Sequence, residues 1–196
     1  MPETTLRVAS YNIQKCIGLD LRRQPRRILN VLEDIGARIV LLQEADKRLP
    51  PRPAALPHFV LNEAGWQDVD LGGAGSLGWH GNAVIWKGQD ISLRDKGHID
   101  LPGLEPRGAV WAAFDTPIGP LRVVGAHLGL TGRARRAQVQ HLAQHIGNWI
   151  DMPVVWGGDF NEWSRSTVLD RLAPMRRFLP PAPSFPALPP PGPLTS

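Results

Sequence analysis

The junction between a short apolar run and the polar residues that follow it constrains the fold of this chain most. The apolar run 154–156 is followed by two glycines and then by Asp159, Phe160 and Asn161. Paired glycines let the backbone approach another segment closely, and residues two apart on an extended chain point to the same side. This junction therefore predicts a buried strand that delivers a carboxylate and an amide to a crevice at its end.

The rest of the chain alternates between strand-like and helix-like segments. Apolar residues recur at helical spacing over residues 25–35 and 133–150, and residues 166–172 are predicted as a short helix. The strand-like segments are 6–13, 38–44, 82–86, 108–114, 120–128 and 152–156. The turn at residues 115–119 predicts a hairpin between two of these strands. Hairpins mixed with crossover helices favour an α/β protein in which strands form two layers with helices outside.

Length and composition fit one globular domain. The chain has 196 residues, of which 42% are hydrophobic and 20% are charged, and this suits one substantial core. We expect that domain to cover residues 1–173. Residues 174–196 contain nine prolines, which withhold backbone donors, so this segment is expected to be an irregular tail.

Several classes of protein are disfavoured by what the sequence lacks. Cys16 is the single cysteine, which excludes an internal disulfide framework and a cysteine-based zinc site. The sequence shows neither a signal-peptide pattern nor an apolar run of membrane-spanning length, so a cytoplasmic location without a membrane span is expected. Nothing indicates an oligomer. The net charge of +4 suits an anionic partner, but the arginines are scattered, which is equally typical of a solvated surface.

Polar residues stand just beyond the apolar part of four predicted strands. Asn12 closes the first, Glu44 the second, His127 the strand 121–126, and Asp159 with Asn161 the last. Singly, such residues are more often turn residues, solvated carboxylates or buried imidazoles. Together, their carboxylate and amide oxygens form a hard donor set that suits Mg²⁺ or Mn²⁺ better than zinc, with an imidazole for phosphate contact or proton transfer.

Five segments, in order and spacing, resemble the endonuclease/exonuclease/phosphatase superfamily of metal-dependent hydrolases, over roughly residues 6–172. These segments are Ser10-Tyr-Asn-Ile13, Leu41-Leu-Gln-Glu44, Gly81-Asn-Ala-Val-Ile85, Gly125-Ala-His-Leu-Gly129 and Gly157-Gly-Asp-Phe-Asn161. Small bacterial members share a further pattern, which is Arg133, Arg136 and Gln138 in this chain. The resemblance implies a four-layer α/β sandwich with two packed mixed sheets flanked by helices.

The resemblance also implies a role for each matching residue. Glu44 would be the main ligand of Mg²⁺ or Mn²⁺, with Asn12 beside the metal or its water. His127 would contact the scissile phosphate. Asp159 would position or deprotonate the attacking water or protonate the leaving group, and Asn161 would hold the phosphate and orient Asp159.

Two further residues are implied as substrate contacts, namely Asn82 and, more weakly, Arg107. The implied substrate is a phosphate ester from nucleic acid, a phospholipid headgroup or a sugar phosphate. Trp86, Trp111 and Trp156 lie in apolar strands and are expected in the core. The tryptophans predicted at a cleft rim, where they would favour nucleic acid, are Trp66, Trp79 and Trp163.

The sequence departs from the family pattern at its end. Family members continue after the segment Phe185-Pro186 to a Leu-Asp-Arg strand and a terminal Ser-Asp-His motif, and neither follows Phe185-Pro186 in this sequence. We therefore expect the C-terminal strands of the second sheet to be missing. Three interpretations remain open: a truncated chain, a variant in which another residue such as His80 substitutes, and a catalytically impaired member. The last would bind a phosphorylated ligand or nucleic acid without cleaving it.

Overall fold

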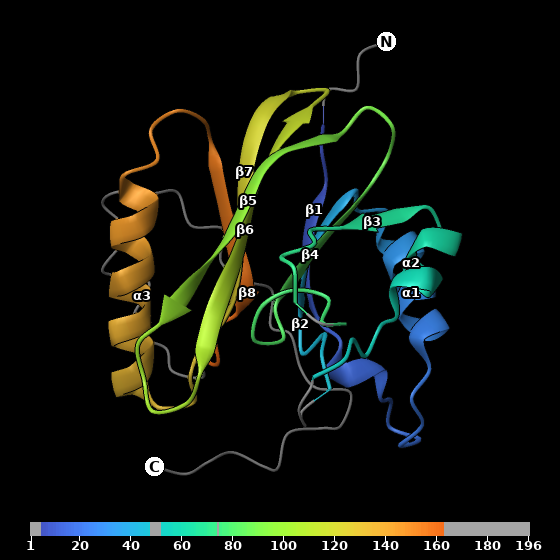
Figure 1. Ribbon diagram of the computed structural model, residues 1–196, viewed down its shortest axis with the longest axis horizontal. Coiled ribbons are helices and arrows are strands. Elements are labelled where there is room, and N and C mark those ends of the chain that lie inside the picture. Colours follow the sequence, from blue (N-terminus) through green and yellow to red (C-terminus); the bar gives the residue numbers. More distant parts are fainter. Residues whose placement is uncertain (1–4, 48–51, 74, 163–196) are drawn as a thin grey trace.

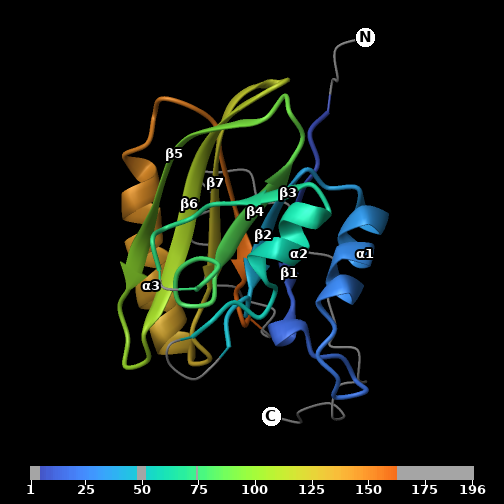
Figure 2. The ribbon, with the colours of Figure 1, turned by 45° about the vertical axis from the view of Figure 1, so that its right-hand side comes forward.

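Two four-stranded sheets pack face to face and carry helices on their outer faces (Figures 1 and 2). This is a computed structural model that describes residues 5–47, 52–73 and 75–162. The first sheet is covered by two helices and the second by one long helix. The predicted four-layer α/β sandwich is confirmed. The predicted helix 166–172, the proline-rich tail and the expected lack of C-terminal strands all lie outside the described residues.

The first sheet has the strand order β1-β2-β4-β3, in which β1 and β2 are parallel and β4 is antiparallel to both of its neighbours. Helix α1 begins at a proline, which suits a first helical turn, and ends at Gly36 in the left-handed conformation (φ 62°). The elements of this half are β1 (Val8–Asn12), η1 (Gln14–Cys16), α1 (Pro25–Ile35), β2 (Ile39–Gln43), α2 (His58–Glu63), β3 (Trp66–Asp68) and β4 (Ala83–Lys87).

The second sheet has the strand order β5-β6-β7-β8, with an antiparallel meander followed by a parallel crossover. The crossover passes through α3, whose N-cap Thr131 accepts a hydrogen bond from the backbone N–H of Ala134 at 3.3 Å. The elements are β5 (Ser92–Leu101), β6 (Arg107–Thr116), β7 (Gly119–His127), α3 (Gly132–Gly147) and β8 (Val154–Asp159).

Four elements were not predicted: the single turn η1, helix α2, and strands β3 and β5. Helix α2 and strand β3 are too short to show a period, with six and three residues. Strand β5 is mostly polar and only partly buried, and its pairing with β6 shifts register between Leu93 and Asp95. Strand β8 continues through its glycines to Asp159, three residues beyond its predicted end, because the parallel ladder with β7 persists to that residue.

The core has a layer on each side of β2, all five residues of which are buried. Val40 and Leu42 face the cluster under α1 and α2, whereas Ile39 and Leu41 face the cluster between the sheets. Trp66 is 1% exposed and belongs to the first cluster, so its predicted place at a cleft rim is wrong. Its indole lies in the apolar layer between the first sheet and helices α1 and α2.

The remaining tryptophans divide between core and half-buried positions. Trp86 is buried between the sheets, as predicted. Trp111 and Trp156 are only partly buried and pack against the cluster beneath α3, since they face outward on their strands. Trp163 lies outside the described residues.

The glycines of β8 allow close contact between the two sheets. A side chain at Gly157 would stand 3.0 Å from the Cδ1 atom of Leu41, and one at Gly125 would stand 3.3 Å from its Cβ atom. Gly125 and Gly157 are paired across β7 and β8. Leu41 of the first sheet therefore packs into a slot that two neighbouring glycines leave in the second.

Sheet topology brings the ends of several strands to one end of the molecule. Strands β1 and β2 are parallel, as are β7 and β8, and in Figure 1 all four carboxyl ends lie toward the bottom. Strands β4 and β6 run antiparallel to β2 and β7, so their amino ends meet at the same place. Residues that follow β1, β2, β7 and β8 therefore lie at the same end of the molecule as residues that precede β4 and β6.

None of the helices among the described residues combines the length and the apolar character that a membrane span requires.

Candidate active site

One amide joins the carboxylates of the two sheets. The Nδ2 atom of Asn12 donates to Asp159 Oδ2 at 2.9 Å and to Glu44 Oε1 at 3.3 Å. The Oδ1 atom of Asn12 accepts the backbone N–H of Gln14 at 3.0 Å, which fixes the orientation of the amide. Asn12 therefore presents its donor to both carboxylates. Three residues predicted from separate strand ends are brought together.

Asp159 is held on three sides by groups from β1, β7 and its own loop. Besides Asn12, its Oδ1 atom accepts the backbone N–H of Asn161 at 3.0 Å, and its Oδ2 atom lies 3.7 Å from His127 Nε2. Asn161 has a left-handed backbone (φ 49°), and its Nδ2 atom donates to the carbonyl of Leu128 at 2.9 Å. Asp159 and Asn161 are thus both hydrogen-bonded to Leu128, the first residue after β7.

His127 is paired in register with Asp159 across the parallel strands β7 and β8. Burial lowers the pKa of His127 below its ordinary value of 6.5, and the cations of Arg107 and Lys15 act in the same direction, whereas Asp159 opposes the shift. Because the pKa is lowered, the imidazole is mainly neutral at pH 7, with one N–H available as a donor. A neutral imidazole beside a carboxylate can donate to a phosphate oxygen without carrying a charge of its own.

Glu44 stands immediately after β2 with a left-handed backbone (φ 53°). Its Oε2 atom forms an ion pair with Lys15 Nζ, while its main-chain carbonyl accepts the Lys15 N–H at 3.0 Å. The two side chains are 26% and 29% exposed, so the pair is neither fully buried nor open to solvent. Sequence patterns missed Lys15; its position three residues after Asn12, in the loop leaving β1, is the signal that points to it.

The predicted substrate contacts differ in their surroundings. Asn82 is 1% exposed, and its Nδ2 atom donates to the carbonyls of Gly108 at 2.9 Å and Trp79 at 3.3 Å. Its Oδ1 atom is buried without a hydrogen-bond partner among the described residues. Arg107 opens β6, is 18% exposed, and pairs with Glu105 at 3.0 Å. The charge of Arg107 helps to lower the pKa of His127. Asn82 instead connects the two sheets through its hydrogen bond to the main chain of β6.

Gln138 positions the loop that follows His127. It is 1% exposed on α3; its Oε1 atom accepts the N–H of Gly129 at 2.8 Å, and its Nε2 atom donates to the carbonyl of Pro102 at 3.0 Å. In sequence it was only part of a family pattern. Its buried amide gives that pattern a physical meaning, because it ties the end of β7 to the segment after β5.

The predicted alternative histidine, His80, belongs to a cluster at the loop before β4. His80 has a left-handed backbone (φ 48°), and its Nδ1 atom lies 3.2 Å from Arg52 Nη1. The neighbouring Trp79 stacks on His98 with 3.9 Å between ring centroids, and its Nε1 atom donates to Asp100 at 2.8 Å. The loop reaches the site through its main chain, since the carbonyl of Gly81 accepts the N–H of the residue after Glu44 at 2.9 Å.

The donor set fits a hard divalent cation. Among residues 5–47, 52–73 and 75–162, no three His, Cys, Asp or Glu side chains gather closely enough to hold a metal alone. Mg²⁺ usually takes one or two protein carboxylates and completes its shell with water and substrate phosphate. The carboxylate of Glu44, 26% exposed beside Asn12 and Asp159, has the chemistry of such a ligand.

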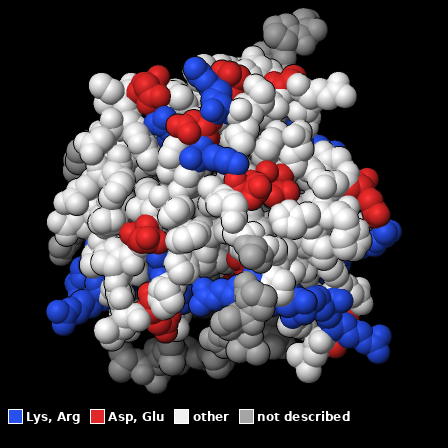
Figure 3. Space-filling model, in the orientation of Figure 1, with Lys and Arg blue, Asp and Glu red and all other residues white. Residues whose placement is uncertain are grey.

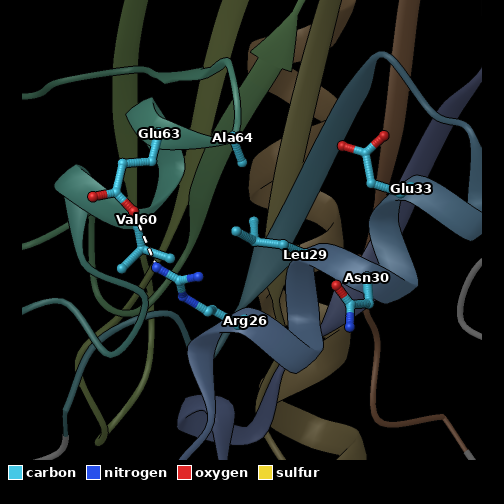
Figure 4. A pocket seen from close by; sticks show the side chains of 7 residues that line it. All are labelled: Arg26, Leu29, Asn30, Glu33, Val60, Glu63 and Ala64. Atoms are coloured by element: carbon cyan, nitrogen blue, oxygen red, sulfur yellow. Dashed lines mark hydrogen bonds and ion pairs between the residues drawn. The ribbon is translucent and has the colours of Figure 1, made fainter.

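Charge and shape distinguish the site from other surfaces. Lysine and arginine side chains gather along the lower part of the face in Figure 3, the end at which β1, β2, β7 and β8 finish in Figure 1. A separate groove of about 310 Å³ lies between α1 and α2, with Leu29 and Val60 in its wall and an Arg26–Glu63 pair across it (Figure 4). That groove is on the outer, helical side of the first sheet, so it does not belong to the strand-end cluster.

Solved structures with this fold include phosphoesterases. The human Nocturnin catalytic domain with bound sulfate anion is 20% identical with a TM-score of 0.63, and the match covers 86% of this chain and 69% of that one. D. rerio TDP2 complexed with single strand DNA product is 17% identical with a TM-score of 0.65, covering 86% and 64%. The mannosyl-6-phosphatase Bt3783 of Bacteroides thetaiotaomicron VPI-5482 is 19% identical with a TM-score of 0.63, covering 85% and 69%.

The chain thus spans about two thirds of the length of these structures. No curated protein sequence matches it. The family model described as "Endonuclease/Exonuclease/phosphatase family" matches residues 9–195, nearly the whole chain. Together with the sandwich fold and the motif order, this match shows that the chain belongs to the endonuclease/exonuclease/phosphatase family.

Proposed function

We propose that this protein hydrolyses phosphate esters with the help of Mg²⁺ or Mn²⁺ bound at Glu44. The observation that carries the proposal is the hydrogen-bonded set Glu44–Asn12–Asp159, which crosses from one sheet to the other and ends beside His127. When bound, the metal would polarise the phosphoryl group and neutralise developing charge. The family to which the chain belongs consists of phosphoesterases, which supports this reaction class.

The residues of the chain divide the remaining work. Asp159 accepts hydrogen bonds from Asn12 and Asn161, which hold its carboxylate in one orientation, and this suits a group that orients or deprotonates an attacking water. His127 is kept neutral by burial and is placed to donate to a phosphate oxygen. Asn161 orients Asp159 through its main-chain N–H. Asn12 orients both carboxylates and lies beside the proposed metal.

Arg107 is the proposed contact for a substrate phosphate oxygen remote from the scissile bond. It is partly buried next to His127 and pairs with the exposed carboxylate of Glu105, which can yield to an incoming anion. Asn82 is proposed to act through position, because its amide holds the strand that begins with Arg107. The substrate classes compatible with this site are nucleic acid, phospholipid headgroups and sugar phosphates.

Hydrolysis of bis(p-nitrophenyl) phosphate and p-nitrophenyl phosphate, with Mg²⁺, Mn²⁺ or EDTA, tests the proposal. We expect metal-dependent product that falls by a factor of about 10³ or more in Asp159→Ala and Glu44→Ala, since both act as part of one catalytic unit. Glu63→Ala, an exposed carboxylate on α2, is the matched control and should keep full activity.

Two results would contradict the hydrolase. One is no turnover by the purified protein with either metal. The other is turnover that Asp159→Ala and Glu44→Ala leave unchanged, which would assign the product to a contaminant. Metal-dependent retention of the phosphate ester without product would instead support a protein that binds phosphorylated ligands without cleaving them.

A further inference from the structure

The segment that carries Lys15 has an unusual backbone. Three consecutive residues other than glycine, Gln14, Lys15 and Cys16, have φ of 46°, 58° and 61°. The left-handed conformation costs roughly 1–2 kcal/mol for each such residue, so the surroundings must hold it in place. Strain of this kind concentrates at functional sites. Here it turns the chain leaving β1 back toward the end of β2.

Several contacts hold this strained segment. The Lys15 N–H donates to the carbonyl of Glu44, and the carbonyl of Lys15 accepts Arg23 Nε at 3.1 Å. Cys16 is 2% exposed, and its carbonyl accepts the N–H of Gln24 at 2.8 Å. Burial also raises the pKa of the Cys16 thiol to about 11, so this group is a neutral packing element. The main chain at Lys15 is therefore held in place, and its side chain reaches the Glu44 carboxylate.

The Lys15 ammonium occupies the carboxylate that the proposed metal requires. Its Nζ atom pairs with Glu44 Oε2, while Asn12 donates to Glu44 Oε1. A lysine ammonium is a compact charge on a flexible stem, so it can exchange one anionic partner for another without a movement of the backbone. A divalent cation at Glu44 and an ammonium at the same oxygen exclude each other by charge and by space.

An ammonium that leaves Glu44 is already close to the group that would meet the phosphate. Glu44 shares the Asn12 amide with Asp159, because Asn12 Nδ2 donates to both carboxylates. Asp159 Oδ2 in turn lies 3.7 Å from His127 Nε2, so the Lys15–Glu44 pair and the imidazole belong to one cluster. A phosphate bound beside His127 would add negative charge to this cluster, next to the carboxylates of Asp159 and Glu44.

We propose that Lys15 is an exchangeable cation of the active site. Without a metal, the Lys15 ammonium neutralises Glu44. When a metal occupies Glu44, the Lys15 ammonium contacts the substrate phosphate instead. This inference rests on the proposed metal site at Glu44. It makes metal binding and anion binding mutually supportive, because each relieves a cost of the other, and that coupling is lost without Lys15.

The coupling predicts opposite changes in two affinities when the charge of Lys15 is removed. In Lys15→Gln, Mn²⁺ binding, followed by the loss of the free-ion paramagnetic resonance signal, should tighten about tenfold because a competing cation is gone. Sulfate serves as the phosphate analogue. Its binding in saturating MnCl₂, followed by thermal shift, should weaken about tenfold because one charged donor is lost.

Three further variants control the experiment. Lys96→Gln removes a lysine on β5 that contacts the carbonyl of Asp70, away from the site, and should leave both affinities unchanged. Lys15→Met keeps the length of the stem and provides a second neutral variant if Lys15→Gln does not fold. Lys15→Arg keeps the charge and should keep Mn²⁺ affinity close to the parent value.

These opposite changes distinguish the proposal from a purely structural role of Lys15. A structural role would weaken the binding of Mn²⁺ and the binding of sulfate together. Weakened Mn²⁺ binding in both neutral variants, or unchanged Mn²⁺ binding in them, overturns the proposal. So does a lack of Mn²⁺ binding by the parent and both neutral variants. Neither readout requires turnover, so an inactive parent that binds Mn²⁺ would defeat the hydrolase proposal while leaving the result for Lys15 standing.

Discussion

At the scale of single residues, Asn82 is proposed to support the site through its buried amide. Its two hydrogen bonds reach the carbonyl of Gly108 on β6 of the second sheet and that of Trp79 in the loop before β4. The first of these joins the sheets just beside Arg107. The motif that contains Asn82 marks the position as important, but only its surroundings distinguish a positional role from a substrate contact.

Asn82→Ala should lower the free energy of unfolding by about 2 kcal/mol, since it leaves two carbonyls without their donor. Urea denaturation measures this loss. The control is Asn62→Ala, an exposed residue of α2, which should change stability little. Unchanged stability in Asn82→Ala together with a raised KM would instead identify a direct contact with substrate.

His80 should give the protein a measurable dependence of stability on pH. Burial lowers the pKa of His80 below 6.5, and the neighbouring Arg52 acts in the same direction. The unfolded chain therefore takes up a proton at this residue more readily than the folded protein. The contribution of neutral His80 is fully present above pH 6.5 and is lost as the pH falls toward the lowered pKa.

Urea unfolding of the parent and of His80→Asn at pH 7.5, 6.5 and 5.5 tests this sign. Asparagine tolerates the left-handed backbone at this position and does not titrate. The stability of the parent relative to His80→Asn should fall as the pH is lowered. A constant or rising difference would show that the folded state does not disfavour the protonated imidazole.

At the scale of elements, β8 depends on a glycine where its ladder with β7 is tightest. Gly158 has φ of 149°, and a Cβ atom there would stand 1.9 Å from the carbonyl oxygen of Ala126. The next residue pair in this ladder is His127 with Asp159. The element that delivers the carboxylate therefore reaches the site only because this position has no side chain.

Gly158→Ala should destabilise the protein by about 3 kcal/mol or more, because the backbone must shift at a fixed strand pair. Gly147→Ala at the end of α3 is the matched control, since nothing lies within 4 Å of its added Cβ atom. That change should be neutral or stabilise by up to about 1 kcal/mol. Equal stabilities of the two variants in urea would contradict the close approach of β7 and β8.

At the scale of the whole molecule, the site lies where the two sheets meet, so ligands there should stabilise both sheets together. Glu44 directly follows β2 of the first sheet, whereas His127 and Asp159 end β7 and β8 of the second. A ligand that binds only the folded protein stabilises it by about 2.7 kcal/mol at one hundred times its dissociation constant. MnCl₂ and sulfate together should therefore raise Tm in one cooperative transition.

Differential scanning fluorimetry with MnCl₂, sulfate and both together measures this effect. Glu44→Ala should abolish the rise caused by Mn²⁺, and Glu63→Ala should preserve it. An equal rise in the parent and in Glu44→Ala would place the stabilising ion elsewhere on the surface.

The sequence by itself determined the family, the sandwich architecture and the residues that meet at the strand ends. The order and spacing of five motifs indicated the family, and buried strands stood out as continuous apolar runs followed by polar residues. The glycines before Asp159 indicated close backbone contact, which the packing of Leu41 against Gly157 confirms. The sequence gives no such signal for the polar strand β5 or for the short elements α2 and β3, because strand pairing and tertiary packing determine whether they form. Tertiary packing likewise determines that Trp66 is buried.

Only the tertiary structure decided how these residues act on one another. The hydrogen bond from Asn12 to Asp159, the lowered pKa of His127 and the pairing of Lys15 with Glu44 all involve groups at least twenty residues apart in sequence. Sequence periodicity reports which side of an element is buried, whereas charge and hydrogen bonding depend on distances between elements. The physical reason is that electrostatic interactions are set by separation in space and by burial, and the folded sheets fix both.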